Sequence, residues 1–437
     1  MKPPAFIKRL FTKPATTGSK PDRHTRKTVA LCHALLSERG EASGAALARE
    51  ALQAYRMLSG PALSAFFDVL AREFSPDPKA VEEAAGDYRL DPSPANLIRL
   101  QQVVESPRQE LFRRLNLAAG GTAALVEMRR RLLRDLRGQP HWAAIDADLV
   151  HLLGSWFNRG FLSLQRIDWR TPALVLEKLM HYEAVHEIQG WRDLRRRLAA
   201  DRRCYAFFHP ALPDEPIIFI EVALTKGLSD QVQPLLDPDS PVVDPAGADT
   251  AIFYSITNCQ EGLRGISFGN FLIKQVAEDL GREFPRVKTF STLSPIPGFR
   301  RWLAETAAAH PQLSELVDTL AADDWFQRAG PGTRNELMRL CAYYLQHAKH
   351  GQEAADPVAR FHLGNGARME RLNWLADSSK TGIARSAGLM VNYVYRLKDV
   401  ERNHEAYAKE HVVVASPGLS LLARESLPAR LKLRRRQ

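Results

Sequence analysis

Two polar side chains, Ser294 and His362, stand in segments that suit proton transfer. Ser294 lies in STLSPIPGF, where Pro295 and Pro297 restrict the backbone and so hold the hydroxyl in place. His362 lies in FHLGNGA, and an unperturbed imidazole titrates near about 6.5, so it can hold a transferable proton near neutrality. Taken alone, a serine before proline also caps turns, and a single histidine is also a common buried polar group. If the two side chains meet, they could orient a carboxylate and pass a proton to a reacting carbon.

A glycine-rich segment, NCQEGLRGISFGNFLIKQV, could bind a phosphorylated ligand. Three glycines surround Arg264 just before apolar residues recur at helical spacing, so a helix is expected to begin near Ser267. The first amides of a helix lack intrahelical partners and lie at the positive end of its dipole, which favours a pyrophosphate. The segment is neither a Walker A loop nor a complete G-x-G-x-x-G motif, and an ordinary turn from strand to helix is the alternative.

A serine hydrolase is a rival interpretation of Ser294 and His362, because such a pair can form an acyl-enzyme when a third group orients the histidine. The G-x-S-x-G elbow of α/β-hydrolases is absent, since Ser294 lies in LSPIPG. Among enzymes, an acyltransferase is therefore a better alternative than a hydrolase.

The elements that must position these residues fall into two regions. Before about residue 158, apolar residues recur at three- and four-residue intervals between Gly and Pro breaks, which predicts a helical bundle. Beyond it, GFLSLQRIDW alternates like a strand, and CYAFFHPALPDEPIIFIEVAL reads as two strands joined by a turn. AIFYSIT is a further buried strand, and DPDSPVVDPAGADT is an exposed loop. At 437 residues the chain is long enough for two cores.

Several phrases occur together in one order and with one spacing: FYSITNCQEGLRGISFGNFLIKQV, FSTLSPIPGFRRWL, LMRLCAYYL, PVARFHLGNGA, RLNWLADSS and GLMVNYVY. In this arrangement the chain closely resembles malonyl-CoA decarboxylases, from about Gly160 to Tyr395 and more loosely before. The resemblance implies an α+β multidomain protein, with an N-terminal helical bundle followed by a GNAT-like (acetyltransferase-like) mixed α/β catalytic domain. It also implies conversion of malonyl-CoA to acetyl-CoA and carbon dioxide without a metal or an organic cofactor.

The same resemblance assigns roles to individual residues. Ser294 would orient the malonyl carboxylate or relay a proton, His362 would donate the proton, and Tyr395 of NYVY would lie near them. The CoA-binding loop would consist of Arg264, Gly265, Ile266, Ser267, Phe268, Gly269 and Asn270. Some relatives carry glutamate where this chain has Ser267, so no role of that carboxylate transfers.

The resemblance also sets the expected organisation: a basic tail over residues 1–24, a bundle that serves oligomerisation over 25–158, and the catalytic domain over 159–437. It suggests a homotetramer. The alternative to a decarboxylase is a CoA-dependent acyltransferase, or a CoA-sensing protein that kept the binding loop and lost turnover. A degenerate binder has no chemical need for both Ser294 and His362, which favours the enzyme.

The net charge of +10 resides in the two tails. Residues 1–28 carry eight Lys/Arg and one Asp, and residues 424–437 carry six Lys/Arg and one Glu, so the remainder carries −2. No zinc finger, RNP motif or basic helix with interleaved aromatics accompanies the tails, so a nucleic-acid partner is not expected.

Location and redox state follow from a few further features. No apolar run is long enough to cross a bilayer, and no secretory signal is present. We expect a cytoplasmic protein; the basic, acid-poor start MKPPAFIKRLFTKPATTGSK resembles a transit peptide and makes a mitochondrial-type address the alternative. The scattered cysteines form no C-x-x-C pair and fit reduced thiols. They are Cys32, Cys204, Cys259 and Cys341.

Overall fold

The computed structural model describes residues 22–38, 40–266, 268 and 272–424. The chain divides into two compact units. The first unit comprises the chain up to Phe157 together with Glu261–Ile266, and the second comprises Asn158–Gln260 and the chain after Ile266. A short piece that follows a strand of the second unit in sequence therefore belongs to the helical unit.

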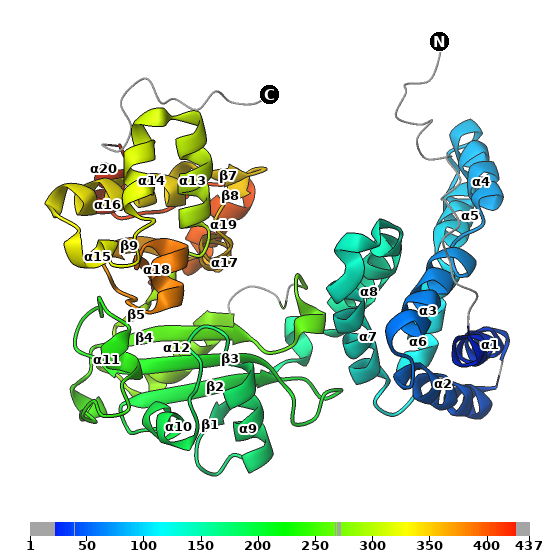
Figure 1. Cartoon of the computed structure of the whole chain (residues 1–437). Coiled ribbons are helices and arrows are strands. Elements are labelled where there is room, and N and C mark those ends of the chain that lie inside the picture. The colour runs from blue at the N-terminus through cyan, green and yellow to red at the C-terminus, as the bar shows by residue number, and fades with distance from the viewer. Residues whose placement is uncertain (1–21, 39, 267, 269–271, 425–437) are drawn as a thin grey trace. The chain divides into compact units, whose positions relative to one another are not determined.

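The first unit is built from helices (Figure 1). Asp77, Ser93 and Ser106 each accept a backbone N–H in the first turn of a helix that starts with proline. A polar cap followed by proline is a strong helix start, because proline lacks only an N–H that would have no intrahelical partner there. The helices are α1 (Arg23–Ser37), α2 (Glu41–Arg56), α3 (Gly60–Glu73), α4 (Pro78–Leu90), α5 (Pro94–Val104), α6 (Pro107–Asn116), α7 (Gly121–Asp135) and α8 (Ala143–Trp156). The expected helical N-terminal region is confirmed.

The second unit contains a mixed sheet with the strand order β1-β2-β3-β4-β5-β10-β6, and β9 pairs with β10. Within it, β4 and β5 are parallel, and the other pairs are antiparallel. The strands are β1 (Ser163–Ile167), β2 (Arg202–Phe208), β3 (Pro216–Thr225), β4 (Thr250–Asn258), β5 (Thr289–Thr292), β6 (Ser294–Pro295), β9 (Arg368–Asn373) and β10 (Met390–Tyr395). A separate hairpin pairs β7 (Lys349–His350) with β8 (Glu353–Ala354).

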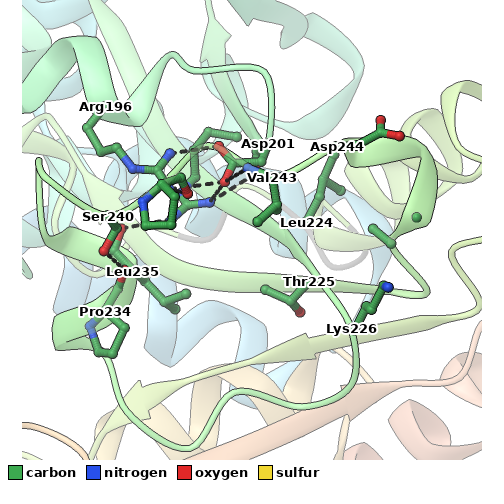
Figure 2. A pocket seen from close by; sticks show the side chains of 14 residues that line it. Arg196, Asp201, Leu224, Thr225, Lys226, Pro234, Leu235, Ser240, Val243 and Asp244 are labelled. Carbon is green, nitrogen blue, oxygen red and sulfur yellow. Dashed lines mark hydrogen bonds and ion pairs between the residues drawn. The ribbon is translucent and has the colours of Figure 1, made fainter.

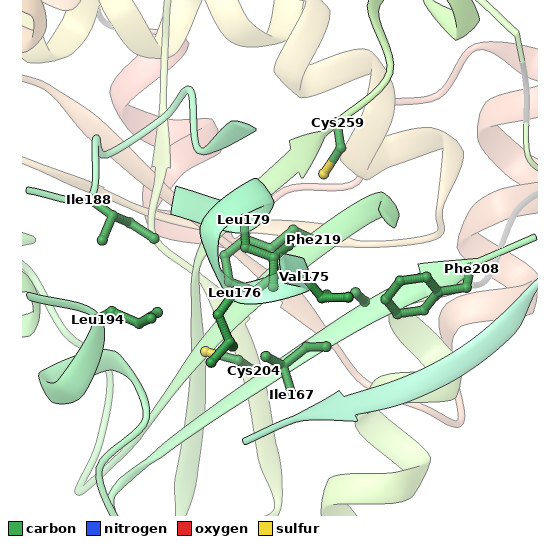
Figure 3. Packing of buried hydrophobic residues seen from close by; sticks show 11 residues of the cluster. Ile167, Val175, Leu176, Leu179, Ile188, Leu194, Cys204, Phe208, Phe219 and Cys259 are labelled. Carbon is green, nitrogen blue, oxygen red and sulfur yellow. The ribbon is translucent and has the colours of Figure 1, made fainter. Parts of the chain in front are cut away.

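Helices cover both faces of this sheet, as strand alternation requires. On one face, Cys204 and Phe208 pack with Leu179 of α9 (Ala173–Tyr182) and Leu194 of α10 (Trp191–Arg197) in one buried cluster (Figure 3). On the other face, the Tyr205 hydroxyl donates to Asp279 of α12 (Leu272–Glu283) at 3.0 Å. Two fully buried thiols, Cys204 and Cys259, belong to the first cluster, and all four cysteines are free and buried.

The rest of the second unit contributes further helices. They are α11 (Gln233–Leu236), α13 (Phe299–Ala309), α14 (Ser314–Thr319), α15 (Trp325–Arg328), α16 (Pro331–His347), α17 (Pro357–Gly364), α18 (Lys380–Ser386), α19 (Val400–Glu410) and α20 (Pro417–Arg424). In the described part of the chain no helix is long and apolar enough to cross a membrane.

The start of the helix expected near Ser267 lies outside the described residues. Ser267 itself is not described, Phe268 is not helical, and α12 is described from Leu272. Just upstream, Gly265 has a φ of 81°, and the Ile266 N–H donates to the Leu263 carbonyl at 3.1 Å. These features turn the backbone tightly before this segment.

Candidate active site

Ser294, His362 and Tyr395, which are far apart in the sequence, meet in one buried hydrogen-bonded chain. Ser294 Oγ lies 3.0 Å from His362 Nε2, and His362 Nδ1 lies 2.7 Å from the Tyr395 hydroxyl. The Ser294 hydroxyl also contacts Thr292, donating to its Oγ1 at 2.8 Å. The structure therefore joins three residues from three separate sequence segments and adds a fourth.

Neighbouring strands and one helix position this chain. Tyr395 ends β10, which pairs antiparallel with β5 on one side and with β6 on the same side further along. Ser294 opens the two-residue strand β6, opposite Val391. This pairing is possible because β10 continues past the end of β5, so its edge is available to the residues that follow β5. His362 comes from α17, whose N-terminus is capped by Asp356.

The hydrogen bonds assign one direction to the protons. A hydroxyl has one proton, so when Ser294 donates to Thr292, its oxygen can only accept from His362 Nε2–H. The neutral imidazole then has a bare Nδ1, which accepts from the Tyr395 hydroxyl. Tyr395 thus donates to His362, His362 donates to Ser294, and Ser294 donates to Thr292, which is the final acceptor.

Burial fixes the charge state of the site. His362 is 2% exposed and Tyr395 is 1% exposed. Because burial penalises the imidazolium, the pKa of His362 falls from its usual 6.5 to about 3, and the pKa of Tyr395 rises well above 10 for the same reason. The His362 ring also stacks on Tyr393, with centroids 4.5 Å apart and planes at 26°. His362 does not titrate near 6.5 as an unperturbed imidazole would, and the transferable proton expected of it is the single N–H of a neutral ring.

Thr292 was missed from the sequence, although a simple signal was present. It lies two residues before Ser294, and in an extended chain residues i and i+2 face the same side. Asn392 holds it by donating to its carbonyl at 2.8 Å, while the Tyr393 backbone N–H donates to Thr292 Oγ1 at 3.2 Å. These two donors fix the acceptor that faces the Ser294 hydroxyl.

Two cavities of the second unit are lined by none of the four hydrogen-bonded residues Thr292, Ser294, His362 and Tyr395. One of about 600 Å³ lies beneath residues 237–248, where Arg196 and Arg202 share the carboxylate of Asp201 (Figure 2). Arg196 also donates to the carbonyl of Pro241 in this segment, and Arg202 donates to the carbonyl of Leu235 in α11 just before it. The other, of about 940 Å³, is lined by Pro295 and Pro297 but by none of the four hydrogen-bonded residues. In the described residues no three His, Cys, Asp or Glu side chains gather as metal ligands would.

Comparison with known proteins assigns the family. The family model described as malonyl-CoA decarboxylase C-terminal domain matches residues 160–433, and the corresponding N-terminal domain model matches residues 74–157. "Malonyl-CoA decarboxylase, mitochondrial" of Anser anser anser is 39% identical over 352 residues, which cover 73% of this chain and 70% of the relative. The chain belongs to the malonyl-CoA decarboxylase family.

Solved structures of two bacterial malonyl-CoA decarboxylases resemble this fold along most of their length. That of the Rhodopseudomonas palustris protein has a TM-score of 0.85 and 48% identity, covering 90% of this chain and 98% of the other. That of the Agrobacterium vitis protein has a TM-score of 0.83 and 47% identity, covering 91% of this chain and 99% of the other. The helical region followed by a mixed α/β sheet unit is thus common to all three.

The loop that the malonyl-CoA decarboxylase resemblance assigned to CoA is described only in part. Ser267, Gly269 and Asn270 lie outside the described residues. Arg264, Gly265 and Ile266 belong to the first unit, and Phe268, which is buried, belongs to the second. The described residues therefore do not join the loop into one site.

A residue of the helical unit holds the backbone at the start of this loop, and no sequence motif predicts this contact. Arg129 of α7 is 3% exposed and donates to the carbonyls of Gly262 and Arg264, each at 2.8 Å, while Asp146 pairs with its Nε at 2.8 Å. A Cβ built on Gly262 would lie 2.0 Å from the Val126 carbonyl oxygen, so only glycine allows this approach. The helix and the turn are packed backbone to backbone.

Proposed function

We propose that this protein converts malonyl-CoA into acetyl-CoA and carbon dioxide, with Ser294 and His362 as its proton-handling pair. It is a carboxy-lyase, as its family name states. The observation that carries the assignment of residues is the buried chain Tyr395, His362, Ser294 and Thr292. It supplies a relay of neutral donors, which is what protonation of a carbanion in a dry site requires.

The reaction balances with one proton from solvent. The bond between the malonyl α-carbon and its carboxylate breaks, carbon dioxide leaves uncharged, and the electron pair becomes the enolate of the thioester. The α-carbon then takes a proton from the Ser294 hydroxyl, Ser294 regains one from His362 Nε2–H as the Tyr395 hydroxyl passes its proton to Nδ1, and a proton from solvent finally restores the relay. Before the bond breaks, the same hydroxyl can orient the carboxylate.

The low pKa of His362 suits this order of events. An imidazolium close to the malonyl carboxylate would stabilise the ground state and oppose loss of its charge. A neutral imidazole does not attract the carboxylate in this way, yet it still offers a proton to the more basic enolate through Ser294. Catalysis then depends on the tautomer that Tyr395 and Thr292 select.

We propose further that the second unit has the GNAT-like fold. In support, β4 and β5 are the parallel pair in an otherwise antiparallel order, and α12 connects them. Their pairing ends at Phe253 and Thr292, while β4 continues to Asn258, so the two strands part at this point. Where the two strands separate, their backbone N–H and C=O groups are available to bind an extended acyl chain.

The CoA-binding role of Arg264–Asn270 is also a proposal. Gly265 in the left-handed region and Arg129 on two carbonyls form a fixed turn before α12, which supports binding of phosphate by backbone amides. The homotetramer and the cytoplasmic location stay predictions. Animal relatives carry the word mitochondrial in their names, which matches the alternative address.

The test is product formation from malonyl-CoA by the purified chain, measured as acetyl-CoA and carbon dioxide. Wild type should turn over, and Ser294→Ala and His362→Ala should lose about 10²- to 10⁴-fold in kcat while keeping their Kd for acetyl-CoA. His350→Ala, which alters an exposed histidine, is the matched control. Binding of CoA without release of carbon dioxide by wild type would point to an acyltransferase or a CoA sensor instead.

A further inference from the structure

Asp356 is a buried carboxylate that reaches both segments of the proposed active site. It is 1% exposed, and its two oxygens accept from four groups: the backbone N–H groups of Val358, Ala359 and Gly298 and the hydroxyl of Tyr344. Burial raises the pKa of this carboxyl. Burying a charged group costs free energy unless its hydrogen bonds are satisfied, so the contacts of this carboxylate indicate what it does.

One oxygen holds the helix that carries His362. Asp356 Oδ1 accepts from Val358 N and Ala359 N, each at 3.0 Å, and so caps the first turn of α17. His362 follows within the same short helix, so the cap fixes the position from which the imidazole projects. A serine or threonine could make this cap without burying a charge.

The other oxygen holds the segment that carries Ser294. Asp356 Oδ2 accepts from Gly298 N at 3.2 Å and from the Tyr344 hydroxyl at 3.4 Å. Gly298 comes four residues after Ser294, and Pro295 and Pro297 stiffen the connection. A Cβ on Gly298 would lie 2.1 Å from the Tyr344 hydroxyl oxygen, so the close approach requires glycine. A serine or threonine cap has no second oxygen to make this contact.

We propose that Asp356 is a positioning residue that sets the distance between Ser294 and His362 by tying their two segments together. The proposal rests on the proposed function of that pair. No other described side chain accepts both from the first turn of α17 and from the Ser294 segment. The carboxylate touches none of the four relay residues, so it acts through the backbone of each segment.

The substitution Asp356→Asn distinguishes the contact with Gly298 from the cap of α17. Its carbonyl oxygen can still cap α17, but its NH₂ group faces the Gly298 N–H and cannot accept from it. We expect kcat to fall about 10- to 100-fold, with the Kd for acetyl-CoA and the KM for malonyl-CoA within twofold of wild type. Asp77→Asn, the same change at the cap of α4, is the matched control and should leave kcat unchanged.

Two further measurements separate positioning from plain structural support. In the Ser294→Ala background Asp356→Asn should have little additional effect on kcat, because the group being positioned is gone. Hydrogen exchange of the Gly298 amide should accelerate in Asp356→Asn while the amides of α17 keep their protection. Gly298→Ala, which displaces Tyr344, should reproduce the loss in kcat.

The outcomes are distinct. Wild-type kcat in both Asp356→Asn and Gly298→Ala overturns the proposal, and so does a full additional loss in the Ser294→Ala background. If wild type itself releases no carbon dioxide, the proposed function fails, and exchange at Gly298 still decides whether Asp356 ties the segments. Unchanged exchange there would refute the tie.

Discussion

The hydroxyl of Tyr395 lies 2.7 Å from Nδ1 of His362, on the side of the ring opposite to Ser294. This contact selects the tautomer of the resting site, because a hydroxyl with a pKa well above 10 stays protonated and donates a hydrogen bond to Nδ1. Nε2 therefore carries the proton that faces Ser294. Tyr395 controls the reacting end of the relay without approaching it.

Tyr395→Phe should lower kcat by about 10- to 100-fold, because the tautomer with Nε2 unprotonated becomes accessible and offers Ser294 no proton. Binding of acetyl-CoA should not change. Steady-state kinetics with isothermal titration test this, and Tyr343→Phe, on a half-buried phenol of α16, serves as control. Wild-type kcat in Tyr395→Phe would contradict the assigned tautomer.

Thr292→Val should lower kcat by roughly 10-fold, because the Ser294 hydroxyl loses its acceptor and can donate back to Nε2 instead. Thr292→Ser keeps the hydroxyl and should retain most activity. The pair is compared by kcat at saturating malonyl-CoA. Equal losses in both variants would contradict this role of the hydroxyl, because Thr292→Ser keeps the acceptor.

His362 should make stability depend on pH in the acid range. The unfolded chain holds this proton below about pH 6.5, whereas the folded chain holds it only below about pH 3. Stability from this group is therefore complete above pH 6.5 and is lost as the pH falls, by at most about 1.4 kcal/mol per pH unit. Urea unfolding at pH 5 and pH 7 should show a smaller pH effect in His362→Gln than in wild type, and an equal effect would contradict the buried neutral ring.

Arg129→Lys should raise the KM for malonyl-CoA and the Kd for acetyl-CoA about 5- to 20-fold, with kcat within twofold. One ammonium cannot reproduce the two bonds to Gly262 and Arg264 while keeping Asp146. Arg99→Lys, on an arginine of α5 that pairs with Asp87, is the control. Unchanged binding in Arg129→Lys would separate this turn from CoA.

Local sequence patterns predict where helices and strands form, but not which of these elements contact one another. The caps before Pro78 and Pro94 and the alternation around Cys204 are local, and the helices and strands there could be predicted. Ser294, His362 and Tyr395 came from resemblance, because nothing in their spacing shows that their segments meet.

What the sequence could not reveal depends on tertiary packing. The low pKa of His362 results from burial under strands and helices that close only in the fold. The contact of Asp356 with Gly298 joins residues 58 positions apart, and no periodicity marks it. Thr292 is the exception, since its place on the same strand face as Ser294 could have been read directly.

The backbone approach of Gly262 to Val126 bears on how this enzyme can be divided. Glu261–Ile266 belongs to the helical unit, although it is encoded in the midst of the sheet unit. A fragment that begins at Asn158 would carry this turn without the helix against which it packs and without Arg129. Asn158 is therefore a poor boundary for truncation or domain exchange. The proposed CoA-binding loop would lose the helix that holds its first residues.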